Sequence, residues 1–409
     1  MIHWESREGT RLPIKSWCRE VEPKALAQAL SLANHPALFH HVALMPDCHV
    51  GFGMPIGGVV AARDAVIPNA VGVDIGCGMR AARTTVASDR VLDKAMLRAV
   101  VERVKEAVPV GEGRARRLPL GWSGFEEYRD ALAASGGEPG WLEARGWELD
   151  ALNLGTLGGG NHFIELDRGD DGRAWLMLHS GSRNLGYRIA NYYHRAALDL
   201  DLRRRLELPD RELAYLPLDE ELGRAYLRDM DFALRYAAES RRLMMEALKE
   251  AFASLVPGAG FDLELDIHHN YAARETHLGR EAWVHRKGAT KAGKGERGII
   301  PGSMGSPSYI VEGLGNEESF QSCSHGAGRR MGRAEACRRL DPAACEEAMR
   351  GIVHDRFGPA RLRGAKGGRG LLDLSEAPQA YKDIEEVLAS ELDLVRPLVR
   401  LEALAVVKG

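Results

Sequence analysis

The sequence predicts an α+β fold, with one large mixed domain over residues 1–409. Short apolar runs typical of strands lie beside clusters of glycine and polar residues, which are typical of tight turns. These runs do not alternate strictly with helical segments, as the strands of a doubly wound parallel sheet would. The chain also shows no repeat of fixed period. We therefore expect strands that deliver glycine-rich loops to a site, with helices around them.

Four apolar runs are predicted strands. Three of them end beside a residue that could carry function: VALM (42–45), AWLMLHS (174–180) and FDLELDIHH (261–269). The fourth, LVRLEALAVV (398–407), is apolar enough to be a buried strand. It would hold Lys408 on a fixed support, where the default expectation is a frayed terminus.

Two helices follow from apolar periodicity. In residues 219–256, apolar side chains recur at steps of three, four and seven residues until Pro257-Gly258 ends the pattern. These side chains are Tyr226, Met230, Ala233, Ala237, Met244 and Leu248. A second helix is predicted over residues 383–395, with Leu392 and Val395 on its apolar face and Pro397 ending it.

Composition limits the classes of protein to consider. Of the 409 residues, 45% are hydrophobic and 28% are charged, which excludes global disorder and allows a sizeable core. The apolar runs are far shorter than the roughly 18 residues of a membrane span, and the N-terminus has no apolar signal segment, so we expect a cytoplasmic protein. Six cysteines are too sparse for a disulfide scaffold and favour core thiols or metal ligands.

Charge gives only a local indication of nucleic-acid binding. The formal net charge is -3, yet HRKGATKAGKGER (285–297) holds five basic residues and one acid. We expect Lys287, Lys291 and Lys294 of this basic segment to contact nucleic-acid phosphates. The alternative is a solvated loop without a ligand.

Metal-capable residues recur next to glycine. They are Asp74, Cys77, His162, His179 and His269. Each one alone is more often a buried side chain than a ligand. Together, a carboxylate, a thiolate and three imidazoles are the ligand types of a divalent transition metal, and the thiolate favours zinc.

Three glycine clusters are suited to binding phosphate: GGGNHF (158–163), PGSMGSPS (301–308) and SHGAGR (324–329). Their backbone N–H groups can point into a cavity without obstruction by Cβ atoms. None matches a Walker or Rossmann pattern, and tight turns are the alternative for each cluster. With the basic segment, the three favour a nucleotide or polyphosphate ligand. His325 is then a candidate nucleophile toward phosphorus, because the small residues after it leave room for an adduct.

Several of these stretches closely resemble the motifs of the RtcB-type RNA ligases. They are MPDCHVGFGMPIGG, AVGVDIGCGM, NLGTLGGGNHFIEL, HSGSR, HHN, GIIPGSMGSPSYIV, GLGNEESFQSCSHGAGR, APQAYKD and VVKG, in family order. The resemblance implies an RtcB-like fold. It also implies an enzyme that joins RNA 2′,3′-cyclic phosphate or 3′-phosphate ends to 5′-hydroxyl ends, using GTP and manganese, in tRNA splicing or RNA repair.

The resemblance also implies a role for individual residues. His325 would become guanylylated, GMP would pass to the RNA 3′-phosphate, and the 5′-hydroxyl would displace it. Two manganese ions per chain would share Cys77, one completed by His162 and His179 and the other by Asp74 and His269. The nucleotide site would comprise Asn161, His162, Phe163, Glu165, His269, Asn270, Pro301, Gly302, Ser303, Met304, Ser308, His325, Gly326, Ala327, Gly328, Tyr381 and Lys408.

Two stretches match no motif of the family. Residues 109–147 are rich in glycine, proline and charge, so we expect a surface insertion rather than core, and LRRRLEL (202–208) is rich in arginine. Either is a candidate for selecting the RNA, and an archease-like activator is a candidate partner. Two other functions remain open: a metal-dependent phosphoesterase acting on RNA ends, and a non-catalytic protein that binds nucleotide or RNA.

Overall fold

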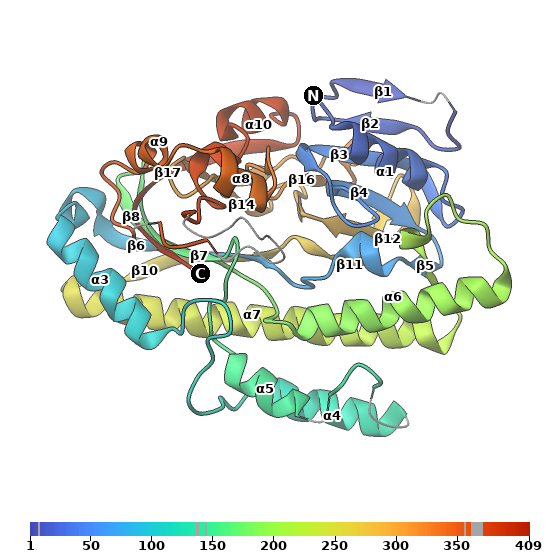
Figure 1. Ribbon diagram of the computed structural model, residues 1–409, viewed down its shortest axis with the longest axis horizontal. Coiled ribbons are helices and arrows are strands. Elements are labelled where there is room, and N and C mark those ends of the chain that lie inside the picture. Colours follow the sequence, from blue (N-terminus) through green and yellow to red (C-terminus); the bar gives the residue numbers. More distant parts are fainter. Residues whose placement is uncertain (7–8, 136–138, 144, 356, 361–370) are drawn as a thin grey trace.

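Two large sheets dominate this computed structural model, which describes residues 1–6, 9–135, 139–143, 145–355, 357–360 and 371–409 (Figure 1). The six-stranded sheet has the order β1-β2-β3-β4-β12-β11, and the seven-stranded sheet has the order β10-β6-β8-β7-β17-β15-β14. Neighbouring strands are antiparallel, apart from the parallel pair β2 and β3. This mixed architecture confirms the predicted α+β fold.

The strand bounds are as follows. The six-stranded sheet contains β1 (Trp4–Ser6), β2 (Ile14–Ser16), β3 (Leu38–His49), β4 (Ile56–Ala62), β12 (Arg280–Lys287) and β11 (Asn270–His277). The seven-stranded sheet contains β10 (Phe261–His268), β6 (Gly78–Ala87), β8 (Arg173–Ser180), β7 (Phe163–Gly169), β17 (Val395–Lys408), β15 (Ser308–Gly313) and β14 (Arg297–Ile300). Two short pairs join β13 (Ala289–Lys291) to β16 (Ser322–Ser324) and β5 (Ala65–Val66) to β9 (Leu216–Pro217). All four predicted strands are therefore present.

Helices flank the sheets on opposite sides (Figure 1). The long helices α6 (Leu185–Arg204) and α7 (Glu221–Leu255) run along one side, with α4 (Ser123–Ser135) and α5 (Gly146–Asn153) outside them. The short helices α8 (Arg333–Arg339), α9 (Pro342–Ala348) and α10 (Ile384–Ser390) lie on the other side. The remaining helices are α1 (Pro23–Ala33), α2 (Pro68–Val71) and α3 (Lys94–Ala107). No helix in the described ranges is both long and apolar enough to cross a bilayer.

Helix α7 confirms the helix predicted over residues 219–256. All six side chains of its predicted apolar stripe are buried. The C-terminal part of the stripe, including Met244 and Leu248, packs with Leu176 and Leu178 of β8 into one core cluster. A stripe at three- and four-residue steps buries one face against the sheet, which explains why this part of the chain is helical.

The helix predicted over residues 383–395 is too long. Helix α10 ends at Ser390, Leu392 is 55% exposed, and Val395 begins β17. The chain leaves the helix because the Glu391 side chain turns inward and accepts a hydrogen bond from the backbone N–H of Ser324 (2.8 Å). Pro397 does not end a helix but lies within β17, where the register with β15 is irregular and a residue without an N–H is tolerated.

The segment over residues 109–147 lies on the outer side of α7, but it is not built only from surface residues (Figure 1). In its described part, Phe125, Tyr128 and Trp141 are buried in a cluster with α7. The ring of Tyr128 stacks on Phe232 with centroids 3.9 Å apart. The segment is therefore peripheral, as expected of a surface insertion, but its few buried aromatic residues anchor it to α7.

Candidate active site

Strand register brings the predicted metal-capable residues to one end of the seven-stranded sheet. Gly78 of β6 pairs with Ser180 of β8, and Phe163 of β7 pairs with His179. Gly78 also pairs with His268 of β10. Cys77, His162 and His269 are the sequence neighbours of these paired residues, so they meet His179 at the same edge.

The ligand atoms of these residues form two overlapping groups. The Cys77 Sγ lies 3.3 Å from the His179 Nε2 and 3.6 Å from the His162 Nε2. The His162 Nε2 lies 3.4 Å from an Asp74 carboxylate oxygen, and the His179 Nε2 lies 3.3 Å from the His269 Nε2. Asp74, Cys77 and His162 thus form one group, and Cys77, His179 and His269 form the other.

Cys77 belongs to both groups, in line with the bridging position that the resemblance implies. The implied division of the other four ligands between two ions stays a prediction, because the contacts in the structure join side chains to one another and not to an ion. It joined His162 with His179 and Asp74 with His269, whereas the Asp74 carboxylate lies against His162, and His179 faces His269. The order of the ligands along the sequence carries no information on this division. The division depends on how the loops at this end of the strands pack against one another.

The protonation of these groups fits bound divalent cations. Backbone carbonyls of Leu157 and Asn161 accept from the Nδ1 atoms of His162 (2.9 Å) and His179 (3.1 Å), which leaves the Nε2 atom of each ring as the one that faces the cluster. A single Cys77 S–H can donate to only one of these two Nε2 atoms. Burial lowers the pKa of His179 well below its usual value, which keeps the imidazole neutral. Neutral imidazoles around a thiol and a carboxylate are a donor set for a transition metal.

A buried arginine supports both loops of this cluster. Arg241 of α7 is fully buried and donates to the backbone carbonyls of Gly76 (2.7 Å) and Ser180 (3.1 Å). Its charge is balanced by Asp266 of β10, whose oxygens lie 2.6 and 3.0 Å from its nitrogens. Because Gly76 and Ser180 adjoin Cys77 and His179, this guanidinium fixes the spacing of the two ligands.

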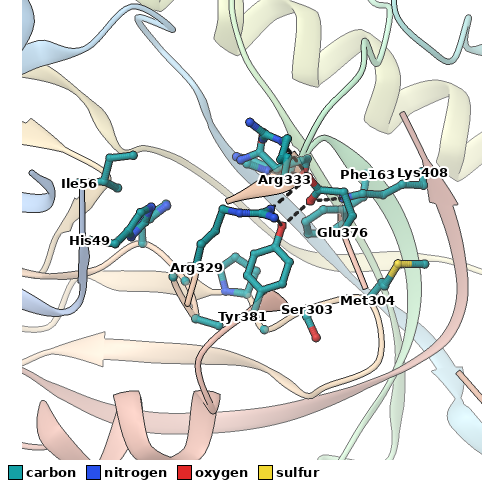
Figure 2. Close-up of a pocket in the computed structure, with 18 residues that line it drawn as sticks. His49, Ile56, Phe163, Ser303, Met304, Arg329, Arg333, Glu376, Tyr381 and Lys408 are labelled. Carbon is teal, nitrogen blue, oxygen red and sulfur yellow. Dashed lines mark hydrogen bonds and ion pairs between the residues drawn. The ribbon is translucent and has the colours of Figure 1, made fainter. Parts of the chain in front are cut away.

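A cavity opens beside the cluster (Figure 2). His49 and Ile56 lie at one end of it, Phe163 and Lys408 lie at the other, and Arg329 and Tyr381 lie between them. Its wall also includes Asn161, His179, Pro301, Gly302, Ser303, Met304, His325, Gly326, Ala327, Gly328, Arg333 and Glu376. Most residues expected at the nucleotide site thus line one cavity.

His325 is held by a buried carboxylate. Its Nδ1 lies 2.5 Å from the Asp47 Oδ2, which also accepts from the His325 backbone N–H (3.2 Å). Asp47 is fully buried, whereas the His325 side chain is 17% exposed. A carboxylate on Nδ1 fixes the tautomer in which Nε2 carries the lone pair. The His325 ring is also 4.9 Å from the ring of His269, so the candidate nucleophile adjoins the metal-ligand cluster.

The small residues after His325 line the cavity beside it and also allow close packing. A Cβ on Gly328, where φ is +73°, would lie 2.4 Å from the Asp47 carbonyl oxygen. A Cβ on Gly326 would lie 3.0 Å from the Pro301 carbonyl oxygen. The expected space for an adduct therefore stays a prediction, and the glycines have a second effect, because their backbones press against Pro301 and Asp47 and so bring Asp47 to His325.

Three cations meet one carboxylate at the far end of the cavity. Glu376 accepts from Arg329 (3.2 Å), Arg333 (3.1 Å) and the Tyr381 hydroxyl, and it forms an ion pair with Lys408 (3.4 Å). Burial alone would raise the pKa of Glu376, but Lys408 and the two arginines lower it to about 2. The group keeps a net positive charge, which suits a ligand that carries phosphates.

Five expected nucleotide-site residues lie outside the cavity wall. His162 and His269 are in the metal-ligand cluster, and Asn270 donates to the backbone of Asp74 (3.1 Å). Ser308 accepts from the backbone N–H of Gly302 (3.1 Å) and so shapes the wall. Glu165 is buried in β7, where burial and the neighbouring Asp167 raise its pKa well above its usual value.

The N-terminal part of the basic segment is not a surface for nucleic acid, whereas the Lys291 side chain is 41% exposed and pairs with Glu296. Arg286 is fully buried against Glu275, and Lys287 is buried with its ammonium on the carbonyl oxygens of Phe52 and Asn69 (2.9 Å for Asn69). Burial lowers the pKa of Lys287 to about 7. The predicted phosphate contact of Lys287 is therefore wrong, because this part of the segment is β12, whereas Lys294 is exposed.

Asp47, Arg329 and Glu376 are among the site residues that were not singled out from the sequence. Asp47 and Arg329 lie inside two of the matched motifs, and Glu376 lies directly before a third. The motifs therefore gave their location but not their roles. Those roles depend on contacts with His325, Tyr381 and Lys408 that only the fold creates.

Comparison with known proteins agrees with this geometry. The sequence model of the family described as "tRNA-splicing ligase RtcB" matches residues 28–409. RNA-splicing ligase RtcB1 of Escherichia coli is 40% identical over 429 aligned residues that cover all of both chains. The RNA-splicing ligase RtcB of Mycobacterium tuberculosis is 33% identical over 93% of this chain and all of the relative, and tRNA-splicing ligase RtcB of Pyrobaculum aerophilum is 32% identical over 94% and 91%. Because the match spans nearly the whole chain, the protein belongs to the RtcB family.

Proposed function

We propose that this protein is an RNA ligase that acts in tRNA splicing or RNA repair. Its relatives are named RNA-splicing or tRNA-splicing ligases, which supports RNA as the substrate. We further propose that it joins an RNA 3′-phosphate or 2′,3′-cyclic phosphate end to a 5′-hydroxyl end, with GTP as cosubstrate. The cyclic phosphate would first be opened by water to a 3′-phosphate. The cationic group around Glu376 supports binding of the GTP phosphates.

The observation that carries this proposal is the His325–Asp47 pair at the cavity wall. With its proton held on Nδ1 by Asp47, the imidazole offers the Nε2 lone pair to the α-phosphorus of GTP. An N–P bond forms, the bond to the β-phosphate oxygen breaks, and pyrophosphate leaves with the electron pair. The Asp47 carboxylate stabilises the positive charge that the ring gains in this step.

Two further transfers complete the proposed reaction. An oxygen of the RNA 3′-phosphate attacks the guanylyl phosphorus, and the electron pair of the N–P bond returns to Nε2. The RNA 5′-hydroxyl then attacks the 3′-phosphorus and loses its proton, and GMP leaves with the electron pair. His325 ends the cycle as a neutral imidazole.

Two manganese ions per chain would be held by Asp74, Cys77, His162, His179 and His269. Bound there, they would neutralise phosphate charge and polarise the phosphorus centres. The shared thiolate also suits zinc, so zinc is the competing metal. The chain itself binds the nucleotide through the Glu376 group, holds the proton on His325 and excludes bulk water from the cluster by burial.

Metal counting tests the shared ligand. Cys77→Ser is expected to lower manganese content at both sites, because a serine hydroxyl is a poor anionic ligand at neutral pH. His162→Ala is expected to lower it mainly at one site, leaving about half of the wild-type ratio. The measurement is the metal-to-protein ratio of the purified, manganese-dialysed proteins. Equal losses in the two variants would remove the bridging role of Cys77.

Covalent labelling tests the nucleophile. The protein is incubated with α-labelled GTP and manganese and then denatured. We expect an acid-labile label on the wild type, none on His325→Ala, and full labelling of His354→Ala, whose ring lies outside the cavity. A label that persists on His325→Ala would show that another residue is the nucleophile.

The same experiment separates the alternatives. A metal-dependent phosphoesterase would release inorganic phosphate from a 3′-phosphate RNA without any labelled protein. A non-catalytic binding protein would give neither label nor phosphate. Joining of a 3′-phosphate strand to a 5′-hydroxyl strand, with GTP required, is the outcome expected of the ligase.

A further inference from the structure

An exposed aromatic side chain stands at the end of the cavity opposite Lys408. Phe52 is 69% exposed and lies in the loop between β3 and β4. The residues on both sides of this loop, His49 and Ile56, line the cavity and mark that end of it (Figure 2). The loop that carries Phe52 therefore borders the cavity directly.

The loop is held firmly, although its aromatic side chain faces solvent. Gln28 makes two hydrogen bonds with the backbone of Gly51 (2.7 and 3.2 Å), and the buried ammonium of Lys287 donates to the Phe52 carbonyl oxygen. The backbone N–H of Met54 donates to the same carbonyl oxygen (2.7 Å). A single exposed phenylalanine is ordinary on a mobile loop, but here the backbone is fixed on both sides of it.

The Phe52 loop also adjoins the loop that carries a metal-capable residue. A Cβ built on Gly72 would lie 3.5 Å from the Lys287 side chain, so residues 72–74 pass the same lysine that holds the Phe52 carbonyl. Val73 in this stretch is 39% exposed, and Asp74 follows it. Apolar surface therefore borders the metal-ligand cluster on the solvent side.

Charge separates the two ends of the cavity. The Lys408 end carries the cationic group around Glu376, which suits nucleotide phosphates. At the other end, the ammonium of Lys287 is turned inward onto carbonyl oxygens, and the exposed surface presents an aromatic ring. An aromatic ring beside a reactive centre suits the flat face of a base, since stacking needs no charge and accepts any base.

We propose that Phe52 is a stacking platform for a nucleobase of the RNA, next to the end that is joined. The inference rests on the proposed RNA-joining function but not on the guanylylated histidine. Fixing the base beside the cavity aligns the adjacent phosphate or hydroxyl with His325 and the metal-ligand cluster. Because every base has a π-face, this contact holds RNA ends without selecting their sequence.

Steady-state joining of two short RNA strands by Phe52→Ala, Phe52→Trp and Leu392→Ala tests the proposal. Leu392 is also more than half exposed, at 55%, and serves as the control for loss of surface apolar area. Phe52→Ala is expected to raise the KM for RNA roughly tenfold, with kcat and the KM for GTP changed much less. Phe52→Trp is expected to stay within about twofold of the wild type, because the indole ring also stacks.

Abasic substrates distinguish stacking from a general effect on the loop. One RNA carries an abasic site in the terminal nucleotide of the 3′-phosphate strand, and another carries it in the 5′-hydroxyl strand. For the strand whose base contacts Phe52, wild type and Phe52→Ala are expected to have equal KM values once the base is absent. A tenfold difference that persists on both abasic substrates would overturn the stacking role, as would an unchanged KM of Phe52→Ala on normal RNA.

Failure of the proposed function gives a different result. If the wild type joins no RNA, the ligase proposal fails before any variant is compared. If it joins RNA and Phe52→Ala matches Leu392→Ala on every substrate, only the stacking proposal fails.

Discussion

Two buried carboxylates of this protein have similar partners but different surroundings. Asp229 of α7 accepts from Tyr128 (2.7 Å), Tyr193 (2.6 Å), Trp141 (2.7 Å) and Arg228 (3.1 Å). Glu376 accepts from two arginines and a tyrosine, and pairs with a lysine. The ring of donors is alike, but Asp229 lies inside the aromatic cluster that holds α4 to α7, whereas Glu376 lines a cavity.

Charge balance explains this difference. The Asp229 carboxylate forms an ion pair with one arginine, Arg228, so the two charges balance. Its hydrogen bonds therefore serve packing. One carboxylate faces three cations at Glu376, which leaves positive charge for a ligand. A buried, hydrogen-bonded acid is therefore a sign of function only when its cations outnumber it and a cavity adjoins it.

Asp229→Asn is expected to have the largest effect on stability. The amide would turn an N–H2 group toward the buried donors Tyr128, Tyr193 and Trp141, at a cost of about 3 kcal/mol in the free energy of unfolding. Urea denaturation measures it, and Asp231→Asn is the control because Asp231 is exposed on the same helix. A loss below about 1 kcal/mol would show that the Asp229 cluster does not anchor the segment.

Glu376→Gln is expected to act on the nucleotide more than on stability. Without the carboxylate, Arg329 and Lys408 lose their shared anchor, and we expect the KM for GTP in self-labelling to rise about tenfold. The control is Glu312→Gln, which removes a more exposed ion pair with Arg396. If Glu376→Gln instead destabilised the protein as much as Asp229→Asn while GTP labelling stayed normal, the contrast between the two carboxylates would be lost.

A third buried carboxylate gives an effect that depends on pH. The donors to Glu391 are the neutral backbone N–H and hydroxyl of Ser324, and burial raises its pKa to about 8. Because the folded protein holds this proton more tightly than the unfolded chain, stability is lost as pH rises from about 4.5 to 8. Glu391→Gln cannot titrate, so its stability relative to wild type is expected to increase over that range. An equal difference in the free energy of unfolding between Glu391→Gln and the wild type at pH 5 and at pH 8 would contradict this.

Elements with a strong apolar pattern were predictable from the sequence. Helix α7 and strand β8 bury continuous apolar faces, and β17 buries its C-terminal residues Ala405, Val406 and Val407. Helix α10 was predicted too long because Leu392 and Val395 continue the helical spacing by coincidence. The chain turns at Glu391, whose partner Ser324 is distant in sequence.

The candidate site was predictable in its residues but not in its contacts. The motifs gave His325, Cys77 and Lys408, but Asp47 became a partner of His325 only because the chain after β16 approaches the end of β3. The prediction of a nucleic-acid surface was wrong for the N-terminal part of the basic segment, and for a related reason. Glu275, which balances Arg286, lies in the neighbouring strand β11, and a count of charges along the chain does not include it.

The position of β17 bears on how the protein is made. This strand is among the last residues of the sequence, yet it is hydrogen-bonded to β7 on one side and to β15 on the other. A chain still leaving the ribosome therefore has β14 and β15 without the strand that connects them to β7. The wall containing Pro301 and the wall containing Phe163 can come together only after residue 408 has been synthesised. Nascent chains should consequently remain inactive and expose unpaired strand edges until β17 has been synthesised, and chaperone protection matters most up to that point.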